Sequence, residues 1–111
     1  DAVVIATPEY AFGIPGALKN ALDWVVGSGE FVQKRVALIG ASPLETGANY
    51  ALEALDRTIR VMTADVVAPL SIPFVRTKID ADGSITDEAL RAALEDIATQ
   101  LVALPISPNA A

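Results

Sequence analysis

Cysteine and histidine are both absent from this chain of 111 residues. Their absence excludes disulfides, thiolate nucleophiles, zinc sites built from Cys and His, and every catalytic triad or general base that depends on histidine. Any chemistry must therefore use carboxylates, hydroxyls, lysines, backbone groups or a bound cofactor. We expect no metal site.

Basic residues and long apolar runs are also scarce. Eight Lys and Arg stand against 14 Asp and Glu, a formal net charge of −6, so neither nucleic acid nor a membrane surface is an expected partner. No apolar run approaches the roughly 20 residues of a transmembrane helix and no signal peptide is visible, so we expect a cytoplasmic protein. Because Asp1 rather than Met heads the chain, we expect the gene to start further upstream.

What the chain has in abundance is hydrophobic residues, 52% against 20% charged, a composition typical of one folded domain. The apolar runs over residues 1–7 and 35–40 do not alternate with polar residues. Such runs are typical of strands buried on both faces of a parallel sheet. A third, shorter strand is expected over residues 65–69.

Helical spacing of apolar residues predicts three helices. The first has Pro15 at its first helical position and ends at Gly27, and the second covers about residues 48–62. Thr86 is expected to cap the third helix, whose buried stripe would be Leu90, Leu94, Ile97 and Leu101. The alternation of strands and helices predicts a three-layer α/β fold with a doubly wound parallel sheet.

The segment between the third strand and the last helix, residues 72–85, is expected to be extended and to turn at Asp82 and Gly83. Asp80 and Asp82 superficially resemble a calcium loop, but the further ligands that such a loop requires are lacking, so a hairpin turn is favoured. The tail over residues 105–111 is expected to fray.

Three strands are few for such a sheet. The run over residues 1–7 is apolar enough to require neighbours on both edges and helices on both faces. We therefore expect one neighbouring strand to be missing from this chain, so that the sequence is the carboxyl-terminal part of a larger domain.

Ligands of open α/β sheets bind at the carboxyl ends of the strands. Two loops leave strands at that edge, residues 7–14 and 41–47, and the first carries the aromatic residues Tyr10 and Phe12. Such a loop can offer backbone groups and an aromatic edge to a planar heterocycle. The alternative interpretation is that it only shapes a strand-to-helix turn.

The first loop and the helix after it carry a family motif. Thr7-Pro-Glu-Tyr10, Ile14-Pro-Gly16 and Leu18-Lys-Asn-Ala-Leu-Asp-Trp24 form an almost continuous stretch of about 18 residues. This stretch resembles the signature of the NADPH-dependent FMN reductase family. These flavodoxin-like proteins include quinone, azo-dye and chromate reductases.

The resemblance implies that Pro8, Glu9 and Tyr10 border the isoalloxazine ring of FMN, largely through main-chain atoms. The family usually has Asn where this chain has Ala11, which places Ala11 beside the ring without a polar side chain. The loop after the next strand would contribute Ser42 and Gly47.

The family's phosphate-binding loop, rich in Ser, Arg and Asn, has no counterpart in this sequence. The resemblance therefore also implies that residues 1–111 are the carboxyl-terminal portion of a single flavodoxin-like FMN-binding domain. This agrees with the strand that burial predicts to be missing.

The activity implied is that of an oxidoreductase in which NADPH or NADH reduces FMN and the flavin passes electrons to a quinone, azo compound, metal ion or free flavin. Two alternatives stay open: a non-enzymatic flavodoxin-like electron carrier, and an inactive fragment that binds no flavin. No catalytic residue is assigned, because Glu9 could be a general base or could serve backbone positioning alone.

The resemblance further implies a homodimer or homotetramer. Trp24 lies off the apolar stripe of its helix, where it could anchor an interface or cover the rim of its own core.

Overall fold

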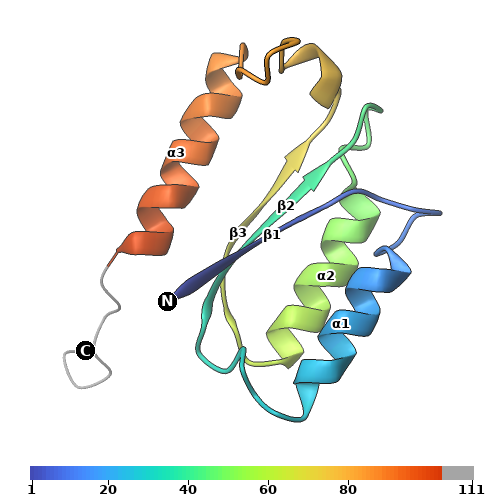
Figure 1. The fold of residues 1–111 in the computed structure, drawn as a ribbon, viewed down its shortest axis with the longest axis vertical. Coiled ribbons are helices and arrows are strands. Elements are labelled where there is room, and N and C mark those ends of the chain that lie inside the picture. The colour runs from blue at the N-terminus through green and yellow to red at the C-terminus, as the bar shows by residue number, and fades with distance from the viewer. Residues whose placement is uncertain (104–111) are drawn as a thin grey trace.

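Strands and helices alternate along the chain, as the apolar pattern predicts (Figure 1). The computed structural model describes residues 1–103, except for the side chain of Ala68, so the tail expected at residues 105–111 lies outside the described residues. The elements in order are β1 (Ala2–Thr7), α1 (Gly16–Val26), β2 (Arg35–Ala41), α2 (Asn49–Val61), β3 (Asp65–Ile72), the 3₁₀ turn η1 (Val75–Thr77) and α3 (Glu88–Val102).

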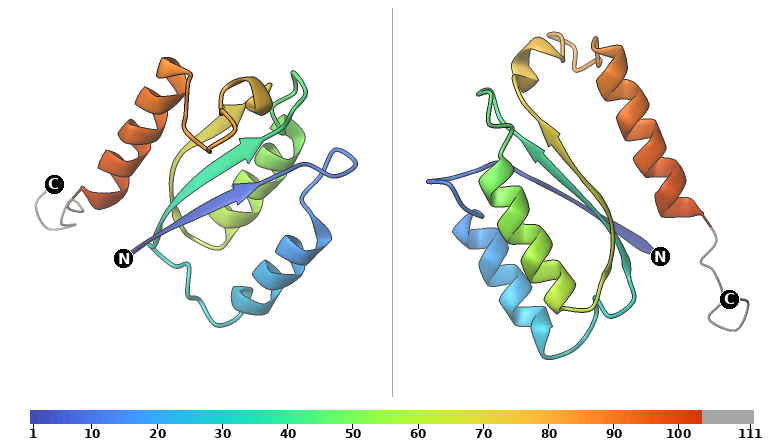
Figure 2. Two further views of the ribbon diagram at one scale, coloured as in Figure 1. Left: turned by 45° about the horizontal axis from the view of Figure 1, so that its top comes forward. Right: turned by 180° about the vertical axis from the view of Figure 1, so that it is seen from behind.

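The sheet is parallel, with the strand order β1-β2-β3. Each strand is followed by a helix, and α1 and α2 lie on one face of the sheet while α3 lies on the other (Figure 2). This is the predicted three-layer arrangement, and it brings the carboxyl ends of all three strands to one edge.

The core has one cluster on each face of the sheet. Val36 and Leu38 of β2 are fully buried against α1 and α2, whose largest buried side chains there are Leu55 and Ile59. Alternate residues of β2 face the other way, where Ala37 packs in a smaller cluster that includes Ile97 of α3. Full burial of a Leu or Ile side chain stabilises a fold by about 1.5–3 kcal/mol, so the α1–α2 face holds most of the stability.

Two predicted helix starts are wrong by one residue. Pro15 is the N-cap of α1 rather than its first helical residue, with a non-helical ψ of 136°. The side chain that caps α3 belongs to Asp87 rather than Thr86, and its Oδ1 accepts a hydrogen bond of 2.8 Å from the Leu90 N–H. Both Thr and Asp are good caps, so the sequence does not separate adjacent candidates.

β3 does not stop at Pro69 as predicted but continues to Ile72. Its register against β2 shifts in this region, since Ala37 pairs with Val67 while Ile39 pairs with Leu70. A bulge accommodates a proline, which has no N–H to donate to the ladder. The strand therefore carries Ser71 to the carboxyl edge of the sheet.

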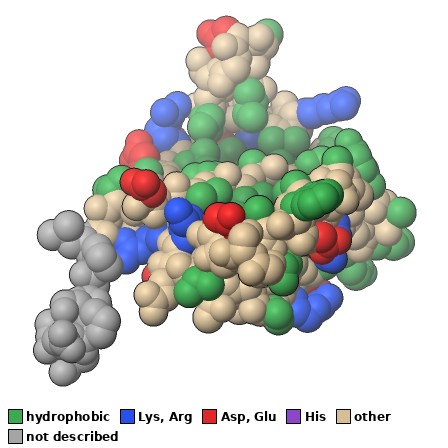
Figure 3. Space-filling model, turned by 60° about the horizontal axis from the view of Figure 1, so that its bottom comes forward, with side chains coloured by type: hydrophobic (Ala, Val, Ile, Leu, Met, Phe, Trp, Pro, Cys, Tyr) green, Lys and Arg blue, Asp and Glu red, His purple; other side chains and the backbone are tan. Residues whose placement is uncertain are grey.

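The prediction that β1 is buried on both faces is wrong within the described residues. β1 pairs with β2 alone, and its residues alternate between half-buried and exposed up to Thr7. Val4 is 53% exposed because α3 packs over β2 and β3 rather than over β1. Hydrophobic side chains are visible at several places on the surface (Figure 3).

The segment between β3 and α3 is only partly as predicted. The 3₁₀ turn η1 was not apparent from the sequence, but the hairpin turn at Asp82 and Gly83 is confirmed. Ile79 and Ile85 form an antiparallel bridge across it, and Gly83 has the positive φ of 87° that favours glycine. No helix among the described residues is long and apolar enough to cross a membrane.

Candidate functional site at the carboxyl ends of the strands

The loop after β1 closes on itself in a tight turn. The N–H of Tyr10 donates to the Gly13 carbonyl at 3.1 Å, and the Gly13 N–H donates back to the Tyr10 carbonyl at 3.0 Å. The two residues between them, Ala11 and Phe12, have positive φ values of 48° and 62°. Positive φ at both central positions is the mark of a type I′ turn, which normally carries Asn or Gly.

The backbone of that turn suits Asn better than Ala at position 11. Asn tolerates the left-handed region far better than Ala, so the Asn that the family usually has suits the backbone at this position. Here the turn keeps its shape with Ala at a strained position. The loop of residues 8–13 must therefore be supported by contacts outside the turn.

One such contact comes from Glu9. Its Oε2 accepts a hydrogen bond of 2.9 Å from the N–H of Ala51, in the first turn of α2. A second contact joins the same turn of α2 to the tip of the loop, because the rings of Phe12 and Tyr50 lie 5.0 Å apart and tilted by 55°. Figure 1 shows the loop after β1 beside the amino end of α2.

The second loop, residues 42–47, is held by bonds within it and to the end of β3. The N–H of Ser42 donates to the Ile72 carbonyl at 3.1 Å, and the Ser42 carbonyl accepts from Val75 at 3.0 Å. The Ser42 hydroxyl accepts from the Leu44 N–H at 3.0 Å. The Phe74 N–H closes the set by donating to the Leu44 carbonyl at 3.1 Å.

Gly47, the last residue of this loop, packs closely against Ser71 and Pro73. Its φ is +58°, and a β-carbon there would lie 2.2 Å from the Ser71 Oγ and 3.0 Å from the Pro73 nitrogen. The Ser71 hydroxyl donates to the Gly47 carbonyl at 2.9 Å. Only glycine fits this position, so the backbone of the loop is fixed against β3.

The structure thus brings the six predicted site residues to one edge of the sheet, in two loops that leave neighbouring strands. Their exposure differs: Pro8, Tyr10 and Ala11 are exposed, Glu9 is half-buried, and Ser42 and Gly47 are buried. Sequence reasoning missed Tyr50 and Ser71. Neither residue belongs to a motif, and the register of β3 that places Ser71 was predicted too short.

The donor set fits a flat cofactor held by main-chain atoms. The exposed residues at this edge offer backbone and an aromatic surface, while the side chains of Glu9, Ser42 and Ser71 are engaged in shaping the loops. Backbone held this firmly can face a planar ring without side-chain rearrangement.

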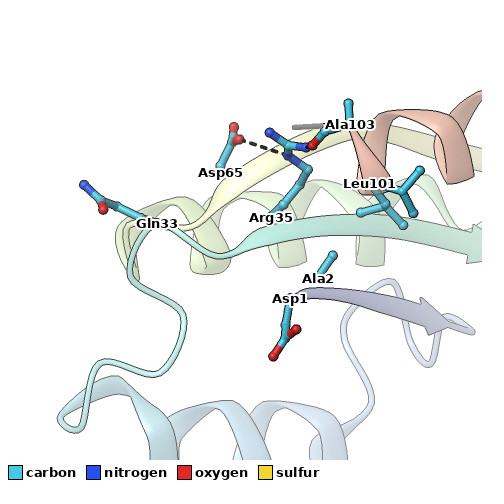
Figure 4. A pocket seen from close by; sticks show the side chains of 8 residues that line it. Asp1, Ala2, Gln33, Arg35, Asp65, Leu101 and Ala103 are labelled. Atoms are coloured by element: carbon cyan, nitrogen blue, oxygen red, sulfur yellow. Dashed lines mark hydrogen bonds and ion pairs between the residues drawn. The ribbon is translucent and has the colours of Figure 1, made fainter. Parts of the chain in front are cut away.

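A separate cavity lies at the opposite edge of the sheet, away from the predicted site. It measures about 480 Å³ and is lined by Asp1, Arg35 and Asp65 among others (Figure 4). The Arg35 guanidinium donates to the backbone carbonyls of Gln100, at 2.9 Å, and Ala103, and it lies 3.6 Å from Asp65. Arg35 therefore clamps the carboxyl end of α3 to the start of β2.

The acidic hairpin is a structural turn. Asp80 Oδ1 accepts from the N–H groups of Asp82 and Ser84, and Asp82 Oδ1 accepts from Ser84 at 2.9 Å. Hydrogen bonding with the Asp80 side chain, followed by that with Ser84, lowers the pKa of Asp82 to about 2. No group of three metal-ligating side chains is found among residues 1–103.

A flavodoxin-like α/β protein is the class that the parallel sheet, the three layers and the loop pair at its carboxyl edge define. The solved structure of FerB, a flavoenzyme NAD(P)H:(acceptor) oxidoreductase from Paracoccus denitrificans, is similar at a TM-score of 0.79 and 32% identity. The similarity covers 91% of this chain and 58% of FerB.

The chain belongs to the NADPH-dependent FMN reductase family, whose profile matches residues 1–78. The chain is 36% identical over 113 residues to the NAD(P)H-dependent FMN reductase PA1204 of Pseudomonas aeruginosa, covering 96% of this chain and 58% of that protein. It is 34% identical over 102 residues to a 2-hydroxy-1,4-benzoquinone reductase of a Burkholderia species, covering 86% and 55%. The chain thus spans little more than half the length of these relatives.

Proposed function

We propose that the protein is an NAD(P)H-dependent flavin oxidoreductase that binds FMN at the carboxyl edge of β1 and β2. The observation that carries this proposal is the loop of residues 8–13, which has the family signature and is fixed by the Glu9–Ala51 hydrogen bond. FMN supplies the redox chemistry when bound, accepting hydride from NADPH or NADH and passing electrons to an acceptor.

The protein's own contribution is to hold and orient the ring. Pro8, Glu9, Tyr10 and Ala11 would border it on the side of β1. The loop that starts at Ser42 and ends at Gly47 would border it on the side of β2. The Glu9 carboxylate and the Ser42 hydroxyl would serve the shape of these loops, since each accepts a hydrogen bond from a backbone N–H.

The acceptor is proposed to be a small molecule: a quinone, an azo compound, a metal ion or free flavin. Support comes from the relatives, which include a 2-hydroxy-1,4-benzoquinone reductase and an NADPH azoreductase of a Bacillus species. The homodimer or homotetramer and the cytoplasmic location stay predictions.

We further propose that residues 1–111 form the carboxyl-terminal portion of one flavodoxin-like FMN-binding domain. The support is β1, an apolar strand that pairs on one side only among the described residues. A preceding strand would pair with the free lateral side of β1. The loop after that strand would bind the FMN phosphate.

FMN titration followed by flavin fluorescence tests the proposal. It should be made with this chain and with a form extended upstream to the start of its gene. Saturable binding by the extended form, followed by NADPH oxidation in the presence of a quinone, is the expected result. Binding without NADPH oxidation would identify an electron carrier, and no binding by either form would reject the flavin assignment.

A further inference from the structure

The amino end of α2 has no cap of its own. Its N-cap residue, Ala48, has a left-handed backbone with φ 63° and ψ 30° and offers no side-chain acceptor. Ala48 is also fully buried. The first N–H groups of a helix have no partner within the helix, so an acceptor must come from elsewhere.

Glu9 supplies that acceptor from 42 residues earlier in the chain. Its Oε2 lies 2.9 Å from the nitrogen of Ala51, the third residue of α2, which is fully buried. The N–H of the third helical position is one from which an N-cap side chain normally accepts a hydrogen bond. A carboxylate is especially suitable, because its charge lies at the positive end of the helix dipole.

The neighbouring contact points the same way. Phe12 packs against Tyr50, the residue before Ala51, with the ring centroids 5.0 Å apart. Glu9, which precedes the turn of residues 10–13, and Phe12, at the tip of that turn, thus contact two consecutive residues of α2. That turn has positive φ at Ala11 and Phe12 and needs such support.

We propose that Glu9 is a positioning residue: through the Ala51 N–H it fixes the loop of residues 8–13 against α2 and so presents the loop's main chain to the flavin. This inference rests on the proposed function. It decides between the two roles that the sequence leaves open for Glu9, general base and backbone positioning. The carboxylate is directed to the helix end, where it accepts a hydrogen bond from a backbone N–H and takes up no proton.

Two substitutions separate these roles. Gln keeps an oxygen that can accept from Ala51 but cannot act as a base, whereas Ala removes the acceptor. Glu9→Ala should weaken FMN binding about five- to thirty-fold, the factor expected for the loss of a helix cap, while Glu9→Gln should stay within about three-fold of wild type. Glu53→Ala, an exposed carboxylate of the same helix, is the matched control and should change nothing.

The measurements are the FMN dissociation constant, the visible flavin spectrum, the pH profile of kcat and the amide exchange of Ala51 without FMN. We expect faster Ala51 exchange and a shifted flavin band in Glu9→Ala, both restored in Glu9→Gln. FMN binding by Glu9→Ala equal to wild type would overturn the positioning role alone. So would a Gln variant as inactive as the Ala variant with one limb of its pH profile lost.

Failure of the proposed function has a different signature. If wild-type protein binds no FMN, both the function and the positioning of a flavin are overturned together. In that case, faster Ala51 exchange in Glu9→Ala would show only that Glu9 stabilises the amino end of α2.

Discussion

The hydroxyl of Ser71 donates a 2.9 Å hydrogen bond to the carbonyl of Gly47, which joins the end of β3 to the loop that follows β2. The same two residues define the tightest point of the candidate site, because a β-carbon on Gly47 would lie 2.2 Å from the Ser71 Oγ. The hydrogen bond and the close approach together fix the path of the chain between residues 47 and 71.

Gly47→Ala is expected to lower the free energy of unfolding by about 2–4 kcal/mol, from the left-handed backbone and from overpacking against Ser71 and Pro73. Urea denaturation measures the loss. Because the clash falls within the proposed FMN site, flavin binding should weaken as well.

Two other glycines separate the causes. Gly83 has φ +87° and open space around its β-carbon position, so Gly83→Ala should cost about 1–2 kcal/mol from the backbone alone. Gly16 has open space at an ordinary helical φ, so Gly16→Ala should stabilise by about 0.4–1 kcal/mol. A Gly47→Ala variant no less stable than Gly83→Ala would contradict the close packing.

Ala11 occupies a turn position that Asn or Gly suits better. Ala11→Asn should raise the free energy of unfolding by about 0.5–1 kcal/mol, since it relieves the left-handed strain at φ 48°. The control is Ala17→Asn on the exposed face of α1, where Asn should destabilise by about 0.5 kcal/mol. Stability is measured by thermal unfolding. If both Asn variants change the free energy of unfolding in the same direction, the result would count against the type I′ turn.

Arg35 clamps α3 to the sheet from the edge opposite the site. Arg35→Ala should destabilise by about 1–2 kcal/mol, because the carbonyls of Gln100 and Ala103 lose a charged donor. Hydrogen exchange should quicken in the last turn of α3. Arg60→Ala removes only an exposed ion pair with Asp56 and should cost about 0.5 kcal/mol or less. An equal increase in hydrogen exchange across the whole protein would argue against a local role of Arg35 at the end of α3.

The hairpin before α3 should respond to acid. Because the pKa of Asp82 is lowered to about 2 in the folded chain, the carboxylate stabilises the turn above the usual aspartate value, near 4. That contribution is lost as the pH falls from there through 2. NMR titration of the Asp82 carboxyl and the Ser84 amide would follow it. Asp80→Ala should move the Asp82 midpoint upward, and an unchanged midpoint would exclude Asp80 as its main cause.

Trp24 is 80% exposed on α1, so the interpretation that it covers the rim of its own core is wrong. An indole of this exposure is a suitable interface anchor. Trp24→Ala should shift sedimentation toward smaller species, whereas Val61→Ala, equally exposed on α2, should not. Unchanged mass in the Trp24 variant would reject the anchoring role.

Local patterns predicted the layers of this fold. The unbroken apolar run of β2 and the helical stripe that includes Leu55 and Ile59 each follow from one segment, and the structure buries both. The motif around Glu9 and Tyr10 likewise pointed to the carboxyl edge of the sheet. Such features need only the residues next to one another in the chain.

Features that depend on distant partners could not be predicted. The burial of the β1 side chains depends on where α3 packs, and the sequence of residues 1–7 carries no information about the position of α3. The partner of Glu9 is a backbone N–H 42 residues away, a group that every residue except proline carries. Ser71 reached the site only because a bulge carried β3 past Pro69.

The bonds that shape the candidate site have a kinetic consequence. Glu9 with Ala51 and Gly47 with Ser71 join residues 42 and 24 positions apart, and each pair lies on different strand–helix units. Such contacts close only after the strands that carry the two loops are paired in register, so this edge should form no earlier than the sheet during folding, and its loops can open without unfolding the sheet. A ligand bound to the two loops would slow their local opening at concentrations too low to slow global unfolding of the sheet measurably.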